Sequence, residues 1–155
     1  MKKMLALALV LGAMLFSGSQ SFKAQDAEGD VLVGVWEPSH GKARVKVEKI
    51  ADKYYGKIVW LREPNDPENG QPKVDKNNPD ESMRKVPLKG YRILKDFTYA
   101  GKKEWVDGTI YDPENGNTYS CVIKAKDDNT LDIRGYIGVK TFGRTDVWKR
   151  VAVKK

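Results

Sequence analysis

The chain has 155 residues, of which 32% are charged and 40% hydrophobic, and its formal net charge is +7. This length suits one domain with a core of its own, and the single cysteine excludes an internal disulfide. Acidic and basic residues are interspersed rather than clustered, so no nucleic-acid partner is expected.

The N-terminal segment has the order of features that is typical of a secretory signal. Lys2 and Lys3 precede an unbroken apolar run over residues 4–16, and a small, polar stretch follows over 17–25. The run is shorter than the roughly 20 residues that cross a bilayer. We therefore expect residues 1–25 to be a signal peptide, and residues 26–155 to be a domain exported to the periplasm or the exterior.

Export changes what the charge of the chain implies. Cleavage would remove Lys2, Lys3 and Lys23 and lower the formal charge to +4 (7 − 3). No cysteine near the boundary could carry a lipid anchor, and no second apolar run long enough to cross a membrane follows. No phosphate-binding glycine motif occurs, so no cofactor is expected.

Beyond the signal, the sequence favours strands almost throughout. Short runs of aromatic and β-branched residues alternate with turn clusters, at the spacing typical of an all-β sandwich or barrel. Most connections are short enough for hairpins, which predicts an antiparallel up-and-down barrel. The eight expected strands cover residues 31–37, 43–50, 54–62, 90–99, 104–111, 117–126, 130–137 and 144–153.

The sequence offers few residues for catalysis or for binding a transition metal. Cys121 shares an apolar strand face with Tyr119 and Ile123, where a free cysteine acts as a small hydrophobe. His40, the single histidine, lies in a turn, and neither a nucleophile elbow nor a histidine–cysteine cluster accompanies it. We therefore expect no catalytic residues and no metal ligands.

One connection, residues 63–87, is much longer than the others and holds five of the seven prolines. Long loops in compact domains often bind ligands. Asn78, Pro79 and Glu81 give the start signals of a short helix, with Asn78 as the N-cap. We expect this loop to cover a barrel mouth as a lid, with contacts from Asn78, Asp80 and Arg84. Its scattered carboxylates leave an irregular calcium site open as an alternative.

A Gly-x-Trp motif, Gly34 to Trp36, lies in the first expected strand. It resembles the opening signature of lipocalin-like barrels, in which the tryptophan closes one barrel end beneath an arginine of the last strand. The resemblance makes Arg150 the expected partner of Trp36, with Arg144 as the second choice. A guanidinium over the indole would add a cation–π contact to apolar burial.

Further motifs extend the resemblance over most of the expected domain. They lie at residues 55–64, 78–80, 87–90, 110–113, 134–136 and 142–145. Together they resemble the bacterial domain-of-unknown-function family 2147. The resemblance implies an exported, single-domain protein with a calycin-like or lipocalin-like barrel, and it implies no catalytic residues and no substrate.

The aromatic side chains suggest what such a barrel could bind. An eight-stranded barrel either fills with its own side chains or holds one small ligand, and the sequence leaves both open. The leading hypothesis is a module that binds a small, partly apolar molecule in the barrel mouth. Its expected ligand contacts are Tyr54, Trp60, Tyr91, Trp105, Tyr119 and Arg134.

Two other functions stay as alternatives. One is a protein- or glycan-interaction module of the cell envelope, with a filled barrel and the long loop as its binding surface. A hydrolytic enzyme comes third, because no nucleophile–base pair is visible. The identity of the ligand and the oligomeric state are left open by the sequence.

Overall fold

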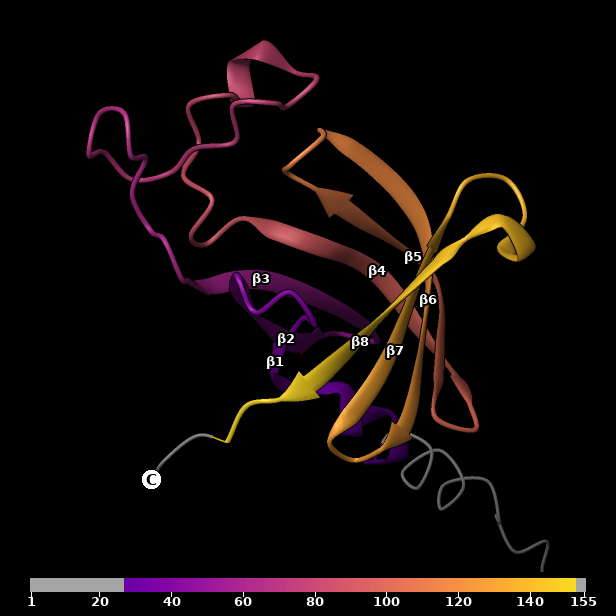
Figure 1. The fold of residues 1–155 in the computed structure, drawn as a ribbon. Coiled ribbons are helices and arrows are strands. Elements are labelled where there is room, and N and C mark those ends of the chain that lie inside the picture. Colours follow the sequence, from indigo (N-terminus) through magenta and orange to yellow (C-terminus); the bar gives the residue numbers. More distant parts are fainter. Residues whose placement is uncertain (1–26, 153–155) are drawn as a thin grey trace, which may run out of the picture.

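The structure is a computed structural model that describes residues 27–152, so the expected signal peptide lies outside the described residues. Eight antiparallel strands form a closed barrel in which each strand pairs with its neighbours in sequence (Figure 1). The first strand also pairs with the last, with Trp36 opposite Arg150. The strands are β1 Gly34–Glu37, β2 Ala43–Ile50, β3 Lys53–Leu61, β4 Arg92–Gly101, β5 Glu104–Asp112, β6 Asn117–Asp127, β7 Thr130–Tyr136 and β8 Arg144–Arg150.

The all-β barrel expected from the sequence is confirmed, and the differences lie at the ends of strands. The segment Asp30–Leu32 forms a short 3-10 helix, η1, instead of beginning the first strand. β4 runs on to Gly101 because the turn of the β4–β5 hairpin is formed by Lys102 and Lys103. Both turn residues have positive φ, 54° and 56°, which matches the twist of a two-residue hairpin turn.

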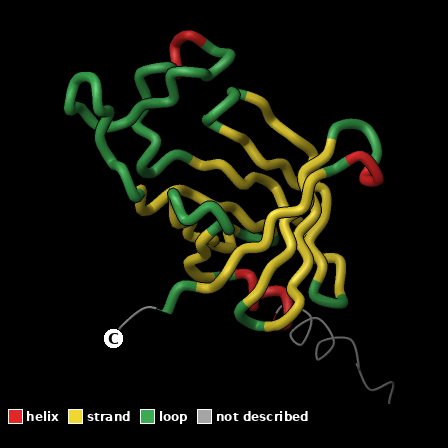
Figure 2. Tube along the Cα trace, in the orientation of Figure 1, coloured by secondary structure: helices red, strands yellow, loops and turns green. Residues whose placement is uncertain are grey.

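The barrel has a closed end and an open end. At the closed end η1 lies across the barrel, Leu32 is fully buried, and the Trp36 indole Nε1 donates a hydrogen bond of 2.9 Å to the Leu32 carbonyl. At the other end lie the connections 38–42, 62–91, 113–116 and 137–143 (Figure 2). The long connection stands out there as an extended loop above the strands.

Arg150 covers Trp36 from outside the barrel. Its Cζ atom lies 4.1 Å from the centre of the indole ring, and its guanidinium donates to the carbonyls of Val31 and Val33. Gly34 has a φ of +144°, and a Cβ atom there would collide with this guanidinium. The Gly-x-Trp motif therefore leaves room for the arginine. Arg144 lies at the open end instead, so it is not the partner of Trp36.

The closed half of the barrel is filled by large side chains. Trp105 and Tyr54 meet edge to face, with ring centres 6.2 Å apart, and both are almost completely buried. Phe97 fills the space over Gly108, where a Cβ atom would collide with its ring. Because this half is packed, any ligand space must lie in the open half.

The long loop has local structure of its own. Isolated bridges join Asn65 to Pro72 and Val74 to Pro87. The expected short helix is present as the 3-10 helix η2, Glu81–Met83, but its N-cap is Asp80 rather than Asn78. A third short helix, η3, covers Lys140–Phe142 in the β7–β8 loop. None of the helices within residues 27–152 is long and apolar enough to span a membrane.

Candidate ligand-binding cavity

A cavity of about 1360 Å³ occupies the open half of the barrel. Small-molecule pockets typically measure about 300–1000 Å³ and are mostly apolar. The cavity is larger because it widens into the mouth between the open-end loops. The apolar and aromatic side chains that form its floor come from β2 to β8, namely Val45, Ile58, Ile93, Ile110, Tyr111, Tyr119, Ile133 and Trp148.

The rim of the cavity is polar and carries both signs of charge. Lys42 of the β1–β2 loop pairs with Glu114 of the β5–β6 turn at 2.8 Å, and the pKa of Glu114 is lowered by this hydrogen bond. Within the long loop, Lys73 pairs with Glu63 at 3.2 Å. Within each pair the positive and the negative charge offset each other. The apolar floor, rather than the rim, therefore defines the kind of ligand that fits.

A buried polar network attaches the long loop to the barrel beside the cavity. Asp75 of the loop has no exposed surface, and its carboxylate accepts hydrogen bonds from Tyr111 Oη at 2.8 Å and Asn78 Nδ2 at 2.7 Å. Asn78 also donates to Tyr91 Oη at 2.9 Å. Burial is the main cause that raises the pKa of Tyr111, and its hydrogen bond to Asp75 adds to it. The loop is thus held at the mouth by bonds between buried groups.

The structure does not bring the six predicted ligand contacts together. Tyr119 lines the cavity, where its hydroxyl accepts from Asn115. Tyr54 and Trp105 face inward but lie in the packed closed half. Tyr91 belongs to the network that holds the long loop. Tyr54, Trp105 and Tyr91 are therefore not among the residues that line the cavity.

Arg134 and Trp60 lie on the outside of the barrel. The Arg134 guanidinium donates to the Lys140 and Thr141 carbonyls and to the Thr145 hydroxyl, so it holds the β7–β8 loop. Trp60 is 37% exposed, with the Arg44 guanidinium 4.5 Å from its ring centre. These two predicted contacts also lie away from the cavity.

A β-bulge explains why Trp60 points outward. By strict alternation it would share the inner face with Tyr54 and Ile58. In the pairing with β2, however, Arg44 faces Trp60 while Val45 faces Ile58, so β3 carries one extra residue at this point. The bulge turns Trp60 to solvent and leaves Leu61 to line the cavity.

The three predicted lid residues stabilise the loop and do not face the cavity. Asn78 is buried in the network around Asp75. Asp80 caps η2 by accepting from the Ser82 amide, and Arg84 donates to the Asn78 carbonyl at 2.7 Å. The loop does border the mouth, but through other residues, Glu63, Asp66, Pro67, Glu68, Lys73, Val74, Lys76 and Asn77.

The described residues offer no metal site and no activated cysteine. No group of three or more histidine, cysteine, aspartate or glutamate side chains within 27–152 is arranged to hold a metal ion, the carboxylates of the long loop included. Cys121 is 1% exposed, and burial raises the pKa of its thiol to about 12. His40 accepts a hydrogen bond from the Lys42 amide in the β1–β2 turn.

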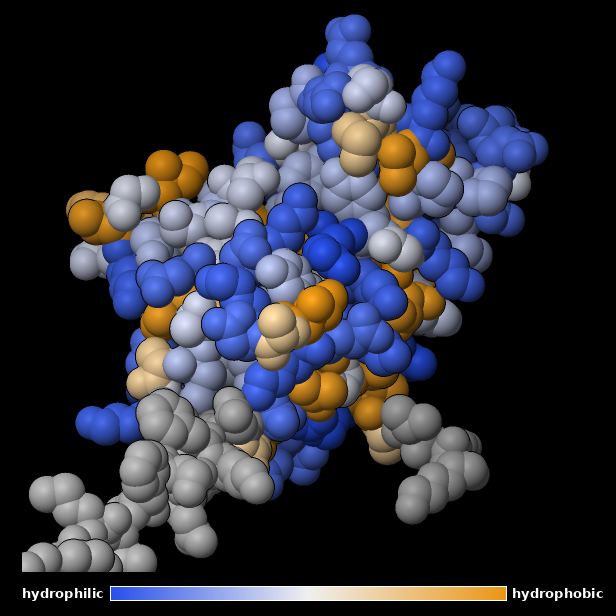
Figure 3. All heavy atoms as spheres, turned by 180° about the vertical axis from the view of Figure 1, so that it is seen from behind, coloured by the Kyte–Doolittle hydropathy of each residue, from blue (hydrophilic) through white to orange (hydrophobic). Residues whose placement is uncertain are grey.

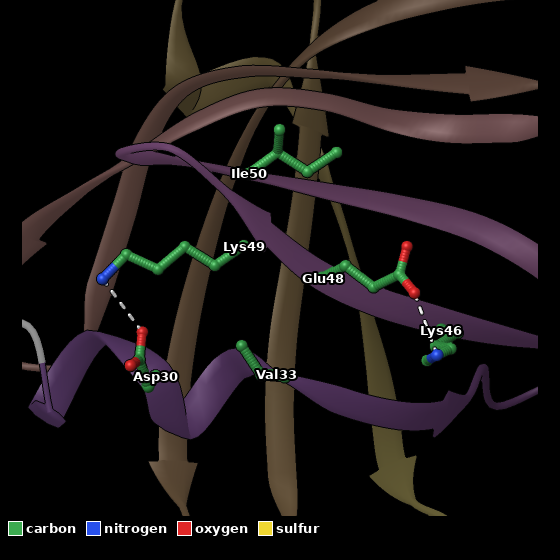
Figure 4. Close-up of a pocket in the computed structure, with 6 residues that line it drawn as sticks. All are labelled: Asp30, Val33, Lys46, Glu48, Lys49 and Ile50. Atoms are coloured by element: carbon green, nitrogen blue, oxygen red, sulfur yellow. Dashed lines mark ion pairs between the residues drawn. The ribbon is translucent and has the colours of Figure 1, made fainter.

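A second, shallow depression lies on the outside of the barrel between η1 and β2 (Figure 4). Ion pairs dominate it, because Lys49 meets Asp30 at 3.1 Å and Lys46 meets Glu48 at 2.9 Å. The close-up shows these side chains turned toward one another across an open surface. Since these charged groups are engaged with each other, this depression is a weaker candidate for a ligand than the cavity.

Comparison with known proteins identifies the family. The family described as "Uncharacterized protein conserved in bacteria (DUF2147)" matches residues 34–150, a range that includes all eight strands. The chain belongs to this family. Among solved structures, the DUF2147 barrel is similar to HP1028 from Helicobacter pylori, which is described as a member of the lipocalin family. The two share 25% identity with a TM-score of 0.66, over 78% of this chain and 83% of that chain. No curated protein matches the chain.

Sequence reasoning missed most of the residues that line the cavity of this DUF2147 barrel. Ile58, Ile93 and Ile133 line it, and each lies within a strand. The sequence signal for them was the apolar alternation itself, which cannot separate a cavity wall from a packed core. Asp75 was also missed, because nothing local distinguishes it from the exposed carboxylates around it.

Proposed function

We propose that this DUF2147 protein is an exported binding module that holds a small, partly apolar molecule in the cavity at the open end of the barrel. One observation carries the proposal: the barrel is packed in its closed half, while its open half is a cavity with an apolar floor. An apolar molecule placed there would remove both its own surface and the floor from water. The part of the proposal that concerns export is based on the N-terminal segment of the sequence.

The arrangement of polar groups suggests how the ligand would lie. The Trp148 indole already donates to Asp146 at 2.8 Å, and the Tyr119 hydroxyl already accepts from Asn115. The floor therefore offers mainly apolar contact, whereas polar and charged side chains lie toward the rim. An apolar body at the floor and a polar group at the mouth fit this gradient. The open cavity favours this function over an interaction module with a filled barrel.

Binding of an apolar dye tests the proposal directly. The protein is titrated into anilinonaphthalene sulfonate, whose emission rises in apolar surroundings, and saturable binding at one site is expected. Ile110→Trp, which adds bulk at the cavity wall, should weaken this binding about tenfold or more. Ile50→Trp is the matched control, because Ile50 is exposed at the closed end and outside the cavity.

Two outcomes would overturn the proposal. One is an absence of saturable dye binding, and the other is equal binding by the Ile110→Trp and Ile50→Trp variants. Native mass spectrometry of protein purified from its own host's envelope then identifies the ligand class, since a bound molecule of low mass is expected to co-purify.

A further inference from the structure

The β7–β8 loop carries the most exposed large hydrophobic side chains among residues 27–152. Phe142 is 83% exposed, Ile137 74% and Val139 57%, whereas the other exposed large hydrophobics are 37–47% exposed. We call residues 137–143 the apolar finger. In Figure 1 this loop projects from the open end of the barrel, and Figure 3, seen from behind, shows apolar atoms protruding at the corresponding edge of the molecule.

Polar bonds from the barrel hold the apolar finger in this outward position. Arg134 lies on the outer face of β7 and donates to the carbonyls of Lys140 and Thr141, at 2.8 and 3.2 Å, and to the Thr145 hydroxyl at 2.9 Å. The 3-10 turn η3 adds a bond from the Gly143 amide to the Lys140 carbonyl. The apolar cavity lies next to the finger, yet these bonds direct Phe142 outward instead of into the floor.

The charged residues within the apolar finger and directly after it are both positive. Residues 137–144 include Lys140 and Arg144 and no acidic residue. Exposed apolar side chains with basic neighbours are the pattern that inserts into the headgroup region of an anionic bilayer. A stable protein interface usually needs about 800 Å² on each partner. The tip of one narrow loop suits a lipid surface better, because a bilayer accommodates isolated protruding side chains.

We propose that the apolar finger docks the barrel on an anionic lipid surface, with Ile137, Val139 and Phe142 inserted between headgroups. Ile137, Phe142 and Arg144 also line the mouth of the cavity. Docking through this loop therefore turns the mouth toward the bilayer. An apolar molecule can then pass between the membrane and the cavity with little exposure to water. The docking itself does not depend on the cavity being a binding site.

A fluorescent label on the finger tests the docking. Cys121 is the only cysteine of the chain and is buried, so a cysteine introduced by Val139→Cys can be labelled selectively with an environment-sensitive dye. Adding vesicles that contain phosphatidylglycerol should shift the emission of this label to the blue. Ile50→Cys, labelled in the same way, is the control at the closed end of the barrel and should show no shift.

The control also separates docking by the finger from binding through the N-terminal apolar segment, if that segment is still attached. A shift of the label at position 50, or none at position 139, would overturn the proposal. Equal shifts with neutral phosphatidylcholine vesicles would overturn the assignment to an anionic surface. Capture of a protein partner in place of vesicle binding would count against it as well.

Two substitutions in otherwise unlabelled protein measure the contributions of the side chains. Phe142→Ser should lower the partition coefficient on anionic vesicles about tenfold or more, because the protein then lacks the aromatic ring that would be buried in the bilayer. Ile50→Ser should leave it unchanged. Lys140→Gln should lower it about fivefold, in line with one lost charge near the surface. Unchanged partitioning of Phe142→Ser, with folding verified by circular dichroism, would contradict the proposal.

Discussion

Asp75 shows at the scale of single residues how the loop and the barrel depend on each other. It is a fully buried carboxylate, and the hydrogen bonds shown for it come from neutral groups, the Tyr111 hydroxyl and the Asn78 amide. A buried polar group without a partner costs about 1–3 kcal/mol, so each member of the network needs the others. The rim of the cavity therefore depends on a residue that does not line the cavity.

Coupling between Asp75 and Tyr111 is the first prediction. Asp75→Ala leaves the Tyr111 hydroxyl without its acceptor and should lower the free energy of unfolding by about 1–3 kcal/mol. Tyr111→Phe should be destabilising as well, and the double variant should cost less than the sum of the two, by about 0.5–3 kcal/mol. Denaturant titrations measure all three. Asp80→Ala, the loss of an exposed helix cap, is the control and should add to Tyr111→Phe without coupling. If Asp75→Ala and Tyr111→Phe were additive, as Asp80→Ala and Tyr111→Phe are expected to be, the network would be contradicted.

At the scale of elements, the irregularities of the strands decide what the barrel presents. The bulge in β3 turns Trp60 outward, and the compact turn of the β4–β5 hairpin lengthens β4 beyond the expected end. In that turn Lys103 has a φ of 56°, a left-handed conformation that costs a residue with a side chain about 1–2 kcal/mol. The bulge and the turn are properties of the backbone, and the pattern of apolar and polar side chains does not predict them.

Replacing Lys103 by glycine should therefore stabilise the protein. Lys103→Gly relieves the left-handed strain, and after the entropic cost of glycine a net gain of about 0.5–1 kcal/mol is expected. The ion pair between Lys103 and Asp128 is exposed, so its loss should matter little. Lys95→Gly, at an exposed position within β4, is the matched control and should destabilise by about 1 kcal/mol. Thermal unfolding of both variants measures these changes. A lower melting temperature for Lys103→Gly than for the unsubstituted protein would contradict the prediction.

At the scale of the whole molecule, burial makes the protein sensitive to alkaline pH. Burial, and secondly a hydrogen bond to Asp30, raises the pKa of Tyr54 to about 12, and burial alone raises the pKa of Cys121 to about 12. The pKa values of Tyr91, Tyr99 and Tyr111 are also raised, with burial as the main cause. The fold keeps these groups neutral at a pH where the unfolded chain has begun to ionise them.

The free energy of unfolding should fall as the pH rises from about 9 to about 12. A folded pKa above the unfolded value gives stability that is complete below the unfolded pKa and is lost as the pH approaches the folded pKa. Denaturant midpoints across this range measure the decline. The double variant Tyr54→Phe, Cys121→Ala should show a shallower decline, with the rest due to the other tyrosines. A decline of unchanged slope would show that these two groups do not couple to unfolding.

Alternation predicted which faces of the strands are buried, but not how deep each residue lies along the barrel axis. Tyr54, Trp105 and Tyr119 all face inward, as their parity requires, yet only Tyr119 of the three lines the cavity. Depth is set by the register between strands, by bulges and by the helix η1 at the closed end. None of these leaves a local signal comparable to a period of two residues.

The sequence by itself determined the class of fold and the order of the strands, because local periodicity and short connections constrain them directly. The closing contact of Arg150 on Trp36 was predicted from the resemblance of the Gly-x-Trp motif to lipocalin-like barrels. It also predicted a signal peptide, which lies outside the described residues. Only the tertiary structure decided that one half of the barrel is filled and the other open, that Asp75 is buried, and that the apolar finger is held outward. Each of these depends on contacts between residues far apart in the chain, and such contacts exist only once the barrel has closed.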